Sequence, residues 1–380
     1  MSRPVKLAVI HWFPIEYYPP ATNLLSVFSN GRELDLTCFT SHNVKDRAPY
    51  TNASCQIVRC QLPTPKQSRL RRIWLYLIYP LTVWLRLVWM KPDAILYMEP
   101  QSAMPVFLYT QMAWRCRVFI HNHEYHDPHQ FLRPGMRIVR FYHWLEKRWL
   151  FRRAEWISQT NTDRIRLFRQ DFPFLEADVV RELPNLPPQE WHQRPNVAWA
   201  KSTDRLRLVY VGSLSCQDTY IREIVEWAAA DAQAGVELHV YSYNFTPDVA
   251  ELFAKHACER VVFHQSGVPY EELPDTLTKF HIGLILYKAN TTNYVFNASN
   301  KLFEYLALGL DVWYPKQMLG VKPYARTDKL PRIIELDFDE LETFELPETG
   351  SRTTLPVATP EPSCEDVLSE LMAKIIKGDA

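Results

Sequence analysis

The chain has 380 residues, which is long for a single domain and sufficient for two domains of ordinary size. Seven cysteines without a Cys-x-x-Cys pair argue against both a disulfide framework and a zinc site. The net charge of zero hides a division, because residues 1–185 carry 25 Lys and Arg against 15 Asp and Glu, while residues 186–380 carry 18 against 28. The basic half is expected to face a membrane surface or a pyrophosphate-linked acceptor, although a solvated face without a partner explains the asymmetry equally well.

The first half of the chain alternates apolar extended runs with helical stretches, which is typical of a parallel sheet covered on both faces. The predicted strands are Lys6–Phe13, Leu34–Thr40, Gln56–Leu62, Asp93–Met98, Arg117–His123, Ala154–Thr160 and Val179–Leu183. The predicted helices are Thr22–Asn30, Arg69–Met90, Ala103–Trp114, Pro134–Phe151 and Thr162–Arg169. We assign residues 1–190 to this domain and the following proline-containing, polar residues 191–204 to a linker.

A second alternating set follows over residues 205–345. Its predicted strands are Leu206–Val211, Val236–Tyr241, Val261–His264, His281–Tyr287, Asp311–Tyr314 and Ile333–Leu336. Residues 346–363 are rich in Pro, Thr and Ser and are expected to be a flexible segment, and residues 364–380 form a terminal helix. Two such halves favour a ligand in a crevice at the carboxyl ends of the strands.

The segment Lys66–Lys91 combines a basic start with tryptophans and tyrosines. Pro80 and Arg86 interrupt its apolar run, which is shorter than a bilayer requires, so a membrane-spanning helix is not expected. Cations beside aromatic rings are typical of a helix that lies in the membrane interface, and residues 133–153 repeat that composition. Two interpretations stay open, peripheral docking on a membrane and ordinary helices that cover the first sheet.

Residues 297–310 predict a helix with an unusual start. Ser299 or Asn300 can cap it, apolar residues recur at helical spacing, and Gly309 stands where a helix ends in the left-handed conformation. The free N–H groups of a helix start suit a phosphate, and a carboxylate one turn further, Glu304, could accept hydrogen bonds from the two hydroxyls of a ribose. The alternative is a capped core helix with a surface glutamate.

Three stretches carry a resemblance to a known family. They are residues 267–274 (GVPYEELP), 280–287 (FHIGLILY) and 300–310 (NKLFEYLALGL). Together they resemble the donor half of GT-B glycosyltransferases, more narrowly the bacterial family-four-like enzymes that build surface polysaccharides. The resemblance covers about residues 206–315. It implies an α/β fold of two Rossmann-like, doubly wound domains facing a central crevice, with a C-terminal helix crossing back to the first domain.

The same resemblance implies a nucleotide-sugar site in the second domain. In it Glu304 would bind the ribose, the backbone of Gly212 and Ser213 would approach the diphosphate, and Phe296 stands where the family usually has a glutamate that holds the transferred sugar. The basic pair of the family is also unmatched at Ser215–Asp218, so we expect Lys288 and Lys301 to supply the positive charge. The remaining residues expected at this site are Tyr243, Ser266, Val268, Ser299 and Asn300.

In the first domain, three histidines and two acidic residues gather in His121–Asp127, after a predicted strand. Residues that alternate on a strand end diverge, so this spacing argues against a metal site. The resemblance implies that His123 and Glu124 lie by the transferring sugar as catalytic residues. His11, Tyr17 and Tyr18 replace the usual glycine-rich loop after the first strand, which suggests that they bind the acceptor by stacking.

These observations predict a metal-independent glycosyltransferase without a cofactor, which uses a UDP- or GDP-linked sugar and a glycan or lipid-linked glycan acceptor. No leader precedes the first strand, so a cytoplasmic location is expected, with peripheral contact at the inner face of the cell membrane. No nucleic-acid partner is expected. Two alternatives remain: a catalytically weakened subunit that binds sugar nucleotides or acts as a scaffold, which Phe296 and the unmatched basic pair suggest, and a sugar-nucleotide epimerase on the same fold.

Overall fold

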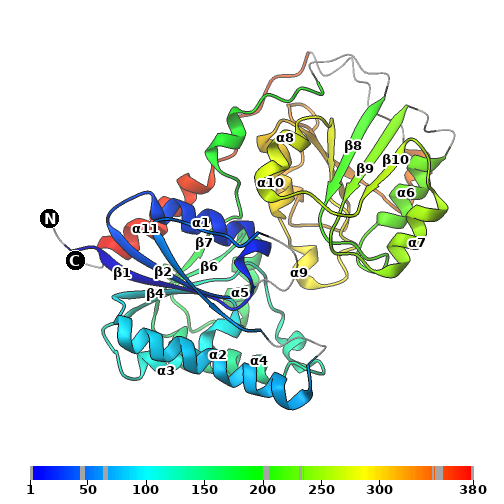
Figure 1. The fold of residues 1–380 in the computed structure, drawn as a ribbon. Coiled ribbons are helices and arrows are strands. Elements are labelled where there is room, and N and C mark those ends of the chain that lie inside the picture. Colours follow the sequence, from blue (N-terminus) through cyan, green and yellow to red (C-terminus); the bar gives the residue numbers. More distant parts are fainter. Residues whose placement is uncertain are drawn as a thin grey trace. The chain divides into compact units, whose positions relative to one another are not determined.

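The computed structural model describes residues 3–42, 48–62, 67–199, 205–230, 233, 235–344, 346 and 354–377. The chain divides into two compact units, each built on its own parallel sheet (Figure 1). Unit 1 comprises Met1–Asn185 and Cys364–Ala380, and unit 2 comprises Leu186–Ser363. Unit 2 has a 3₁₀ turn, Gln189–Gln193, close to its first residue, and Trp191 of this turn is buried.

The sheet of unit 1 has seven parallel strands in the order β3-β2-β1-β4-β5-β6-β7. The strands are β1 Val5–His11, β2 Leu34–Ser41, β3 Cys55–Cys60, β4 Ala94–Met98, β5 Arg117–His121, β6 Ala154–Gln159 and β7 Val180–Glu182. The central strands are buried on both faces, so they are apolar at nearly every position rather than at every second one. The strand order reverses between β1 and β4, and ligands of doubly wound sheets bind outside the carboxyl ends of the strands at such a point.

Helices cover both faces of this sheet (Figure 1). They are α1 Pro19–Ser29, α2 Arg69–Met90, α3 Ala103–Thr110, α4 Arg137–Leu145, α5 Thr162–Asp171 and the terminal helix α11 Cys364–Lys377. The terminal helix packs beside α1, and the guanidinium of Arg117 donates hydrogen bonds to the carbonyls of Lys374 and Ile375. These contacts attach the last helix to the first unit, as the fold prediction stated.

The helix predicted over Pro134–Phe151 is divided. It begins only after Gly135, whose φ of 88° is incompatible with helix, and after α4 it continues as a π-helical turn over Glu146–Leu150. The π turn brings Glu146 inside the unit, where its carboxylate accepts a hydrogen bond from Tyr97 at 3.0 Å. Sequence periodicity does not distinguish this turn from an α-helix.

The sheet of unit 2 has six parallel strands in the order β10-β9-β8-β11-β12-β13. The strands are β8 Leu206–Val211, β9 Val236–Tyr241, β10 Val261–His264, β11 Ile282–Leu284, β12 Asp311–Pro315 and β13 Ile333–Leu336. The helices are α6 Ile221–Ala229, α7 Pro247–Lys255, α8 Leu273–Leu277, α9 Thr292–Val295 and α10 Asn300–Ala307. Here the order reverses between β8 and β11.

Unit 2 departs from the sequence analysis at one predicted strand and from a regular alternation of strands and helices at one connection. The strand predicted over His281–Tyr287 pairs only over Ile282–Leu284, because the chain beyond it turns toward another partner, with Tyr287 bridging antiparallel to Thr219. No α-helix lies between β12 and β13 within the described residues, only the 3₁₀ turn Lys322–Tyr324. Residues 347–353 of the segment predicted to be flexible lie outside the described residues, as do residues 200–204 of the predicted linker.

The fold class predicted from sequence, two doubly wound Rossmann-like units, is confirmed.

Candidate active site

The start of α10 in unit 2 has the capping that the sequence predicted. Ser299 is the N-cap, and its hydroxyl accepts a hydrogen bond from the backbone N–H of Lys301 at 3.2 Å. At the other end Gly309 has a φ of 74°, which is the left-handed conformation expected there. The helix is fixed at both ends by residues that the sequence alone identifies.

Glu304 lies one turn inside α10, and it is not the surface glutamate of the alternative interpretation. Only 6% of it is exposed, and burial raises the pKa of its carboxyl, while Lys301 and Asn300 oppose that rise. The Asn300 amide donates a hydrogen bond to its Oε1 at 2.9 Å. A buried carboxylate held in place by a neighbour is suited to recognise paired hydroxyls, because it needs hydrogen-bond donors to replace lost water.

Lys301 is enclosed by aromatic side chains. Its ammonium donates to the hydroxyl of Tyr287 at 2.9 Å and lies 5.8 Å from the ring centre of Tyr210 and 5.2 Å from that of Tyr287. Burial opposes its charge, but Tyr287 and Glu304 outweigh that effect and raise the pKa of the ammonium. Lys301 therefore presents a firmly protonated cation.

Gly212, after β8, borders this cation. Its φ is 145°, and a Cβ built there would lie 2.7 Å from Cε and 3.0 Å from Nζ of Lys301. Glycine is thus required both for the backbone conformation and for the close approach of the lysine. Gly212 follows β8 and Tyr287 follows β11, so both stand at the point where the strand order of unit 2 reverses. The cation and the glycine backbone are neighbours at the position where doubly wound sheets bind ligands.

Lys288 is held differently from Lys301. Its ammonium forms an ion pair with Glu223 on α6 at 2.6 Å and lies 5.1 Å from the ring centre of Tyr220. The next residue, Ala289, has a φ of 53°, and the Asn290 amide donates hydrogen bonds to Gln217 and Asp218. This turn is tied to α6 and to the loop before it, so the charge of Lys288 is already compensated.

The other residues predicted for the nucleotide site follow neighbouring strands. The Ser213 hydroxyl accepts a hydrogen bond from Asn244 at 3.1 Å. Tyr243 packs on Gly267, where a Cβ would come within 2.9 Å of its ring. Ser266 is exposed and Val268 is half-buried, in the turn after β10. Strands β8, β9 and β10 are adjacent in the sheet, so these residues lie along one edge.

Phe296 follows α9 and is half-buried. The backbone of Phe296 packs closely against Gly320. A Cβ on residue 320 would come within 2.5 Å of the carbonyl carbon of Phe296, so only glycine fits there. The Gly320 N–H also donates to the carbonyl of Val295 at 2.9 Å. The backbone before α10 is therefore fixed against the loop after β12, although the side chain carries no carboxylate.

The carboxyl edge of the unit 1 sheet holds a second group of ionisable residues. His11 ends β1, and its Nδ1 lies 2.8 Å from the carbonyl of Phe13. A carbonyl only accepts, so Nδ1 carries the proton and Nε2 presents a lone pair, which is buried without a hydrogen-bond partner in the described structure. Burial, and to a smaller extent His123, lowers the pKa of His11 to about 4.

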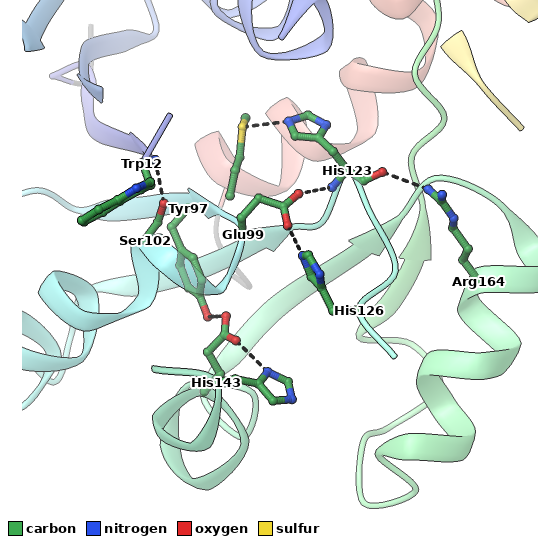
Figure 2. A network of polar contacts seen from close by, with 10 residues as sticks. Trp12, Tyr97, Glu99, Ser102, His123, His126, His143 and Arg164 are labelled. Atoms are coloured by element: carbon green, nitrogen blue, oxygen red, sulfur yellow. Dashed lines mark hydrogen bonds and ion pairs between the residues drawn. The ribbon is translucent and has the colours of Figure 1, made fainter. Parts of the chain in front are cut away.

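Glu99, immediately after β4, joins this group and was not predicted. Its φ of 65° is uncommon for any residue other than glycine, and it is 4% exposed. Its Oε1 accepts a hydrogen bond from the backbone N–H of His123 at 2.9 Å, and its Oε2 lies 2.6 Å from Nε2 of His126, so the carboxylate bridges both ends of one turn (Figure 2). A strained backbone and a buried carboxylate at a strand end together mark a functional position.

The charges of this turn depend on one another. Burial alone would raise the pKa of Glu99, but the hydrogen bond and charge of His126 lower it to about 2. Burial alone would lower the pKa of His126, and the carboxylate raises it instead. The two shifts describe a single ion pair in which Glu99 is the anion and His126 the cation.

His123, predicted as catalytic, is buried, and burial lowers the pKa of its imidazole. Its ring lies 5.9 Å from that of His11 and 6.2 Å from that of Tyr18, and the guanidinium of Arg164 donates to its carbonyl at 2.9 Å (Figure 2). Glu124 is exposed.

The residues predicted for the acceptor lie at the same edge. Tyr18 stands 4.5 Å from His11, ring centre to ring centre. Tyr17 precedes it in the 3₁₀ turn Ile15–Tyr17 and is half-buried. The structure thus brings His11, Tyr18 and His123 together in unit 1. In the described residues no group of three or more His, Cys, Asp or Glu side chains could hold a metal ion.

Neither the family models nor the curated proteins give a match to this sequence. Solved structures do match, and they share the GT-B fold. Sucrose-phosphate synthase from Thermosynechococcus elongatus aligns over 98% of this chain and 90% of its own, with a TM-score of 0.60 and 12% identity. HepE from Anabaena, in complex with UDP and glucose, aligns over 98% of this chain and 95% of its own, with a TM-score of 0.60 and 9% identity.

A third structure, the apo form of the lipopolysaccharide outer core galactosyltransferase WaaB, aligns over 98% of this chain and 94% of its own, with a TM-score of 0.56 and 13% identity. At these identities the likeness shows the fold over nearly the whole chain.

Proposed function

We propose that this protein is a glycosyltransferase that moves a sugar from a UDP- or GDP-linked donor to a glycan or lipid-linked glycan acceptor. The observation that carries the proposal is the start of α10, where the protonated Lys301, the buried carboxylate of Glu304 and the backbone of Gly212 meet at the strand-order reversal of unit 2. The same fold occurs in HepE with UDP and glucose and in a lipopolysaccharide galactosyltransferase.

In the donor half, Glu304 accepts hydrogen bonds from the ribose hydroxyls. Lys301 and the free N–H groups at the helix start stabilise the negative charge that grows on the diphosphate as the glycosidic bond breaks. In this proposal the protein itself supplies the positive charge, so the reaction needs no divalent ion and no cofactor. Lys288 contributes less, because Glu223 already compensates its charge.

In the acceptor half, unit 1 supplies neutral imidazoles at the end of its sheet. His11 presents the lone pair of Nε2 and can accept a hydrogen bond from an acceptor hydroxyl, and the low pKa of its ring keeps it unprotonated at neutral pH. Tyr18 offers an aromatic face to a sugar ring, and His123 completes the group. Glu124 is exposed, which supports a role in contacting the substrate at the surface of unit 1.

The experiment is a nucleotide-release assay with UDP- and GDP-sugars and a glycan extract, combined with titration of free UDP and GDP. Glu304→Ala is expected to weaken nucleotide binding by at least tenfold because a buried acceptor of two hydroxyl bonds is lost. Glu271→Ala, which removes a glutamate of unit 2 in the exposed turn before α8, is the matched control. Equal affinities of the two variants would refute the assignment of Glu304.

Phe296 favours a second candidate, a subunit that binds sugar nucleotides without transferring the sugar, because no carboxylate stands at that position to hold the sugar. Tight nucleotide binding without release of nucleotide in the presence of any acceptor would support this function.

We further propose a cytoplasmic location, with peripheral contact at the inner face of the cell membrane. A lipid-linked acceptor would be met there, and the excess of basic residues in the first half of the chain suits an anionic leaflet. Fractionation of cells that express the protein, with and without a high-salt wash, tests this location.

A further inference from the structure

Helix α2 is apolar on two opposite faces. Its inner face, formed by Leu75, Tyr79, Val83 and Leu87, is buried, and the last three belong to the hydrophobic core of unit 1. A helix that covers a sheet in water normally turns a polar face outward. The outer face of α2 needs another explanation.

That outer face is a continuous apolar stripe. Its members recur every three to four residues, so they share one side of the helix. They are Leu70 (75% exposed), Ile73 (43%), Trp74 (63%), Leu77 (54%), Ile78 (43%), Leu81 (47%), Leu85 (58%) and Trp89 (80%). A stripe of this size on a folded chain marks a contact with a partner or a membrane.

The charges around the stripe are of one sign. Helix α2 contains four exposed arginines, Arg69, Arg71, Arg72 and Arg86, and no acidic residue. Three of them precede the apolar stripe or flank its first turn. Such an arrangement of cations beside tryptophan suits the boundary between anionic headgroups and acyl chains.

Helix α4 and its π turn extend the same composition. Exposed Phe141, Trp144 and Trp149 pack on one another, with ring centres 5.9 Å and 5.1 Å apart. The basic residues Arg137, Arg140, Lys147 and Arg148 are exposed around them. Tyr142 of α4 donates to the carbonyl of Tyr76 of α2 at 3.3 Å, and α2, α3 and α4 lie together on one face of the unit 1 sheet (Figure 1).

Helix α2 is long and apolar enough to cross a membrane by length and composition. Its inner face argues against crossing, because insertion would strip Tyr79, Val83 and Leu87 out of the core of unit 1. A helix that lies on the membrane surface keeps its inner apolar face in the core of unit 1 and removes its outer apolar face from water by contact with lipid.

We propose that the exposed faces of α2 and α4, called here the α2/α4 surface, dock unit 1 on an anionic lipid bilayer, with α2 lying in the plane of the interface. The inference rests on the proposed location and specifies the surface and the lipid chemistry. It does not depend on sugar transfer, since lipid binding and nucleotide binding are measured separately.

The test is co-sedimentation of the full chain with vesicles of phosphatidylcholine alone or mixed with phosphatidylglycerol. The wild type is expected to bind the mixed vesicles, and to bind the neutral vesicles at least tenfold more weakly. The variant Trp74→Ser/Leu77→Ser/Trp89→Ser is expected to lose at least tenfold in affinity for mixed vesicles. Leu319→Ser, which changes an exposed leucine of unit 2, is the matched control and is expected to bind as the wild type does.

A second variant separates charge from apolar contact. Arg71→Glu/Arg72→Glu is expected to weaken binding to mixed vesicles and to leave the weak binding to neutral vesicles unchanged. Retention of UDP or GDP binding by each variant shows that it is folded. The proposal is overturned by equal binding of the triple variant and the wild type, by resistance of the bound protein to extraction with alkaline carbonate, or by a dimer in solution that the triple variant abolishes while wild-type protein ignores vesicles.

Discussion

The two units place ionisable residues at the same point of their sheets but with opposite charge. In unit 1 the buried anion Glu99 immediately follows β4, and the histidines His11 and His123 stay neutral because burial lowers their pKa values. In unit 2 the cation Lys301 is held among tyrosines beside Gly212. The comparison teaches that one fold can present neutral imidazoles at the edge of one sheet and a protonated lysine at the edge of another, through local burial and partners alone.

The largest expected effect concerns the cation of unit 2, Lys301. Lys301→Met removes the ammonium that faces Gly212 and is expected to weaken UDP or GDP binding by about 100-fold, which is about 3 kcal/mol, because a charge-assisted bond to phosphate is lost. Lys288→Met, whose ammonium is paired with Glu223, is the matched variant and is expected to cost less than tenfold. Isothermal titration with the free nucleotides measures both; a larger loss for Lys288→Met would reverse the assignment.

The buried carboxylate of Glu99 in unit 1 is expected to make the stability of the fold depend on pH. The folded-state pKa of Glu99 is depressed to about 2 from the ordinary 4.5, so its ionised form contributes stability that is present above about pH 4.5 and is lost as the pH falls toward 2. The contribution is up to about 3 kcal/mol. Urea unfolding of the full chain, followed at about pH 6 and about pH 3, is expected to show a stability gap between wild type and Glu99→Gln that narrows at the lower pH.

His126, the other member of the ion pair, sets an upper pH limit for the same stabilisation. The pKa of His126 is raised, so its charged form stabilises the fold below its unfolded value of about 6.5, and that contribution disappears as the pH rises through the higher folded value. The two contributions are one ion pair and are not added. A stability gap that stayed constant between about pH 6 and about pH 3 would contradict the pairing.

A smaller effect is expected on catalysis. Glu99→Gln keeps the size of the side chain and loses the charge that orients His126 and holds the backbone of His123. We expect kcat to fall about tenfold, about 1.4 kcal/mol, with nucleotide affinity unchanged, because Glu99 belongs to unit 1 and the proposed nucleotide site to unit 2. A change in nucleotide affinity without a change in kcat would assign Glu99 to the donor instead.

The smallest effect concerns Gly212. Alanine there would adopt a strained φ and push the end of the Lys301 side chain away, and since that end is flexible we expect a loss of only about 1 kcal/mol, roughly fivefold, in nucleotide affinity. Gly235→Ala, where a Cβ meets no atom within 4 Å, is the control. Equal affinities of the two variants would show that Lys301 does not depend on the approach that Gly212 permits.

Much of the architecture could be predicted from sequence. The strands β8, β9 and β10, the helix α2 and the caps of α10 lie where periodicity and capping residues place them. The site was harder to predict, because a single glutamate after a strand does not by itself identify Glu99 as a site residue. The compensation of Lys288 by Glu223 also joins residues 65 positions apart. The positive φ of Glu99 cannot be predicted from the sequence, because the tertiary structure imposes it.

By itself the sequence determined the two alternating halves, the helix capped by Ser299 and the unusual aromatic and basic composition of α2, because these follow from local spacing and side-chain chemistry. Only the tertiary structure decided which charges are buried, paired or presented. It buried Glu304, fixed His11 as a neutral acceptor of hydrogen bonds and left the outer face of α2 uncovered. The reason is that desolvation and pairing depend on neighbours from distant segments, which local sequence does not specify.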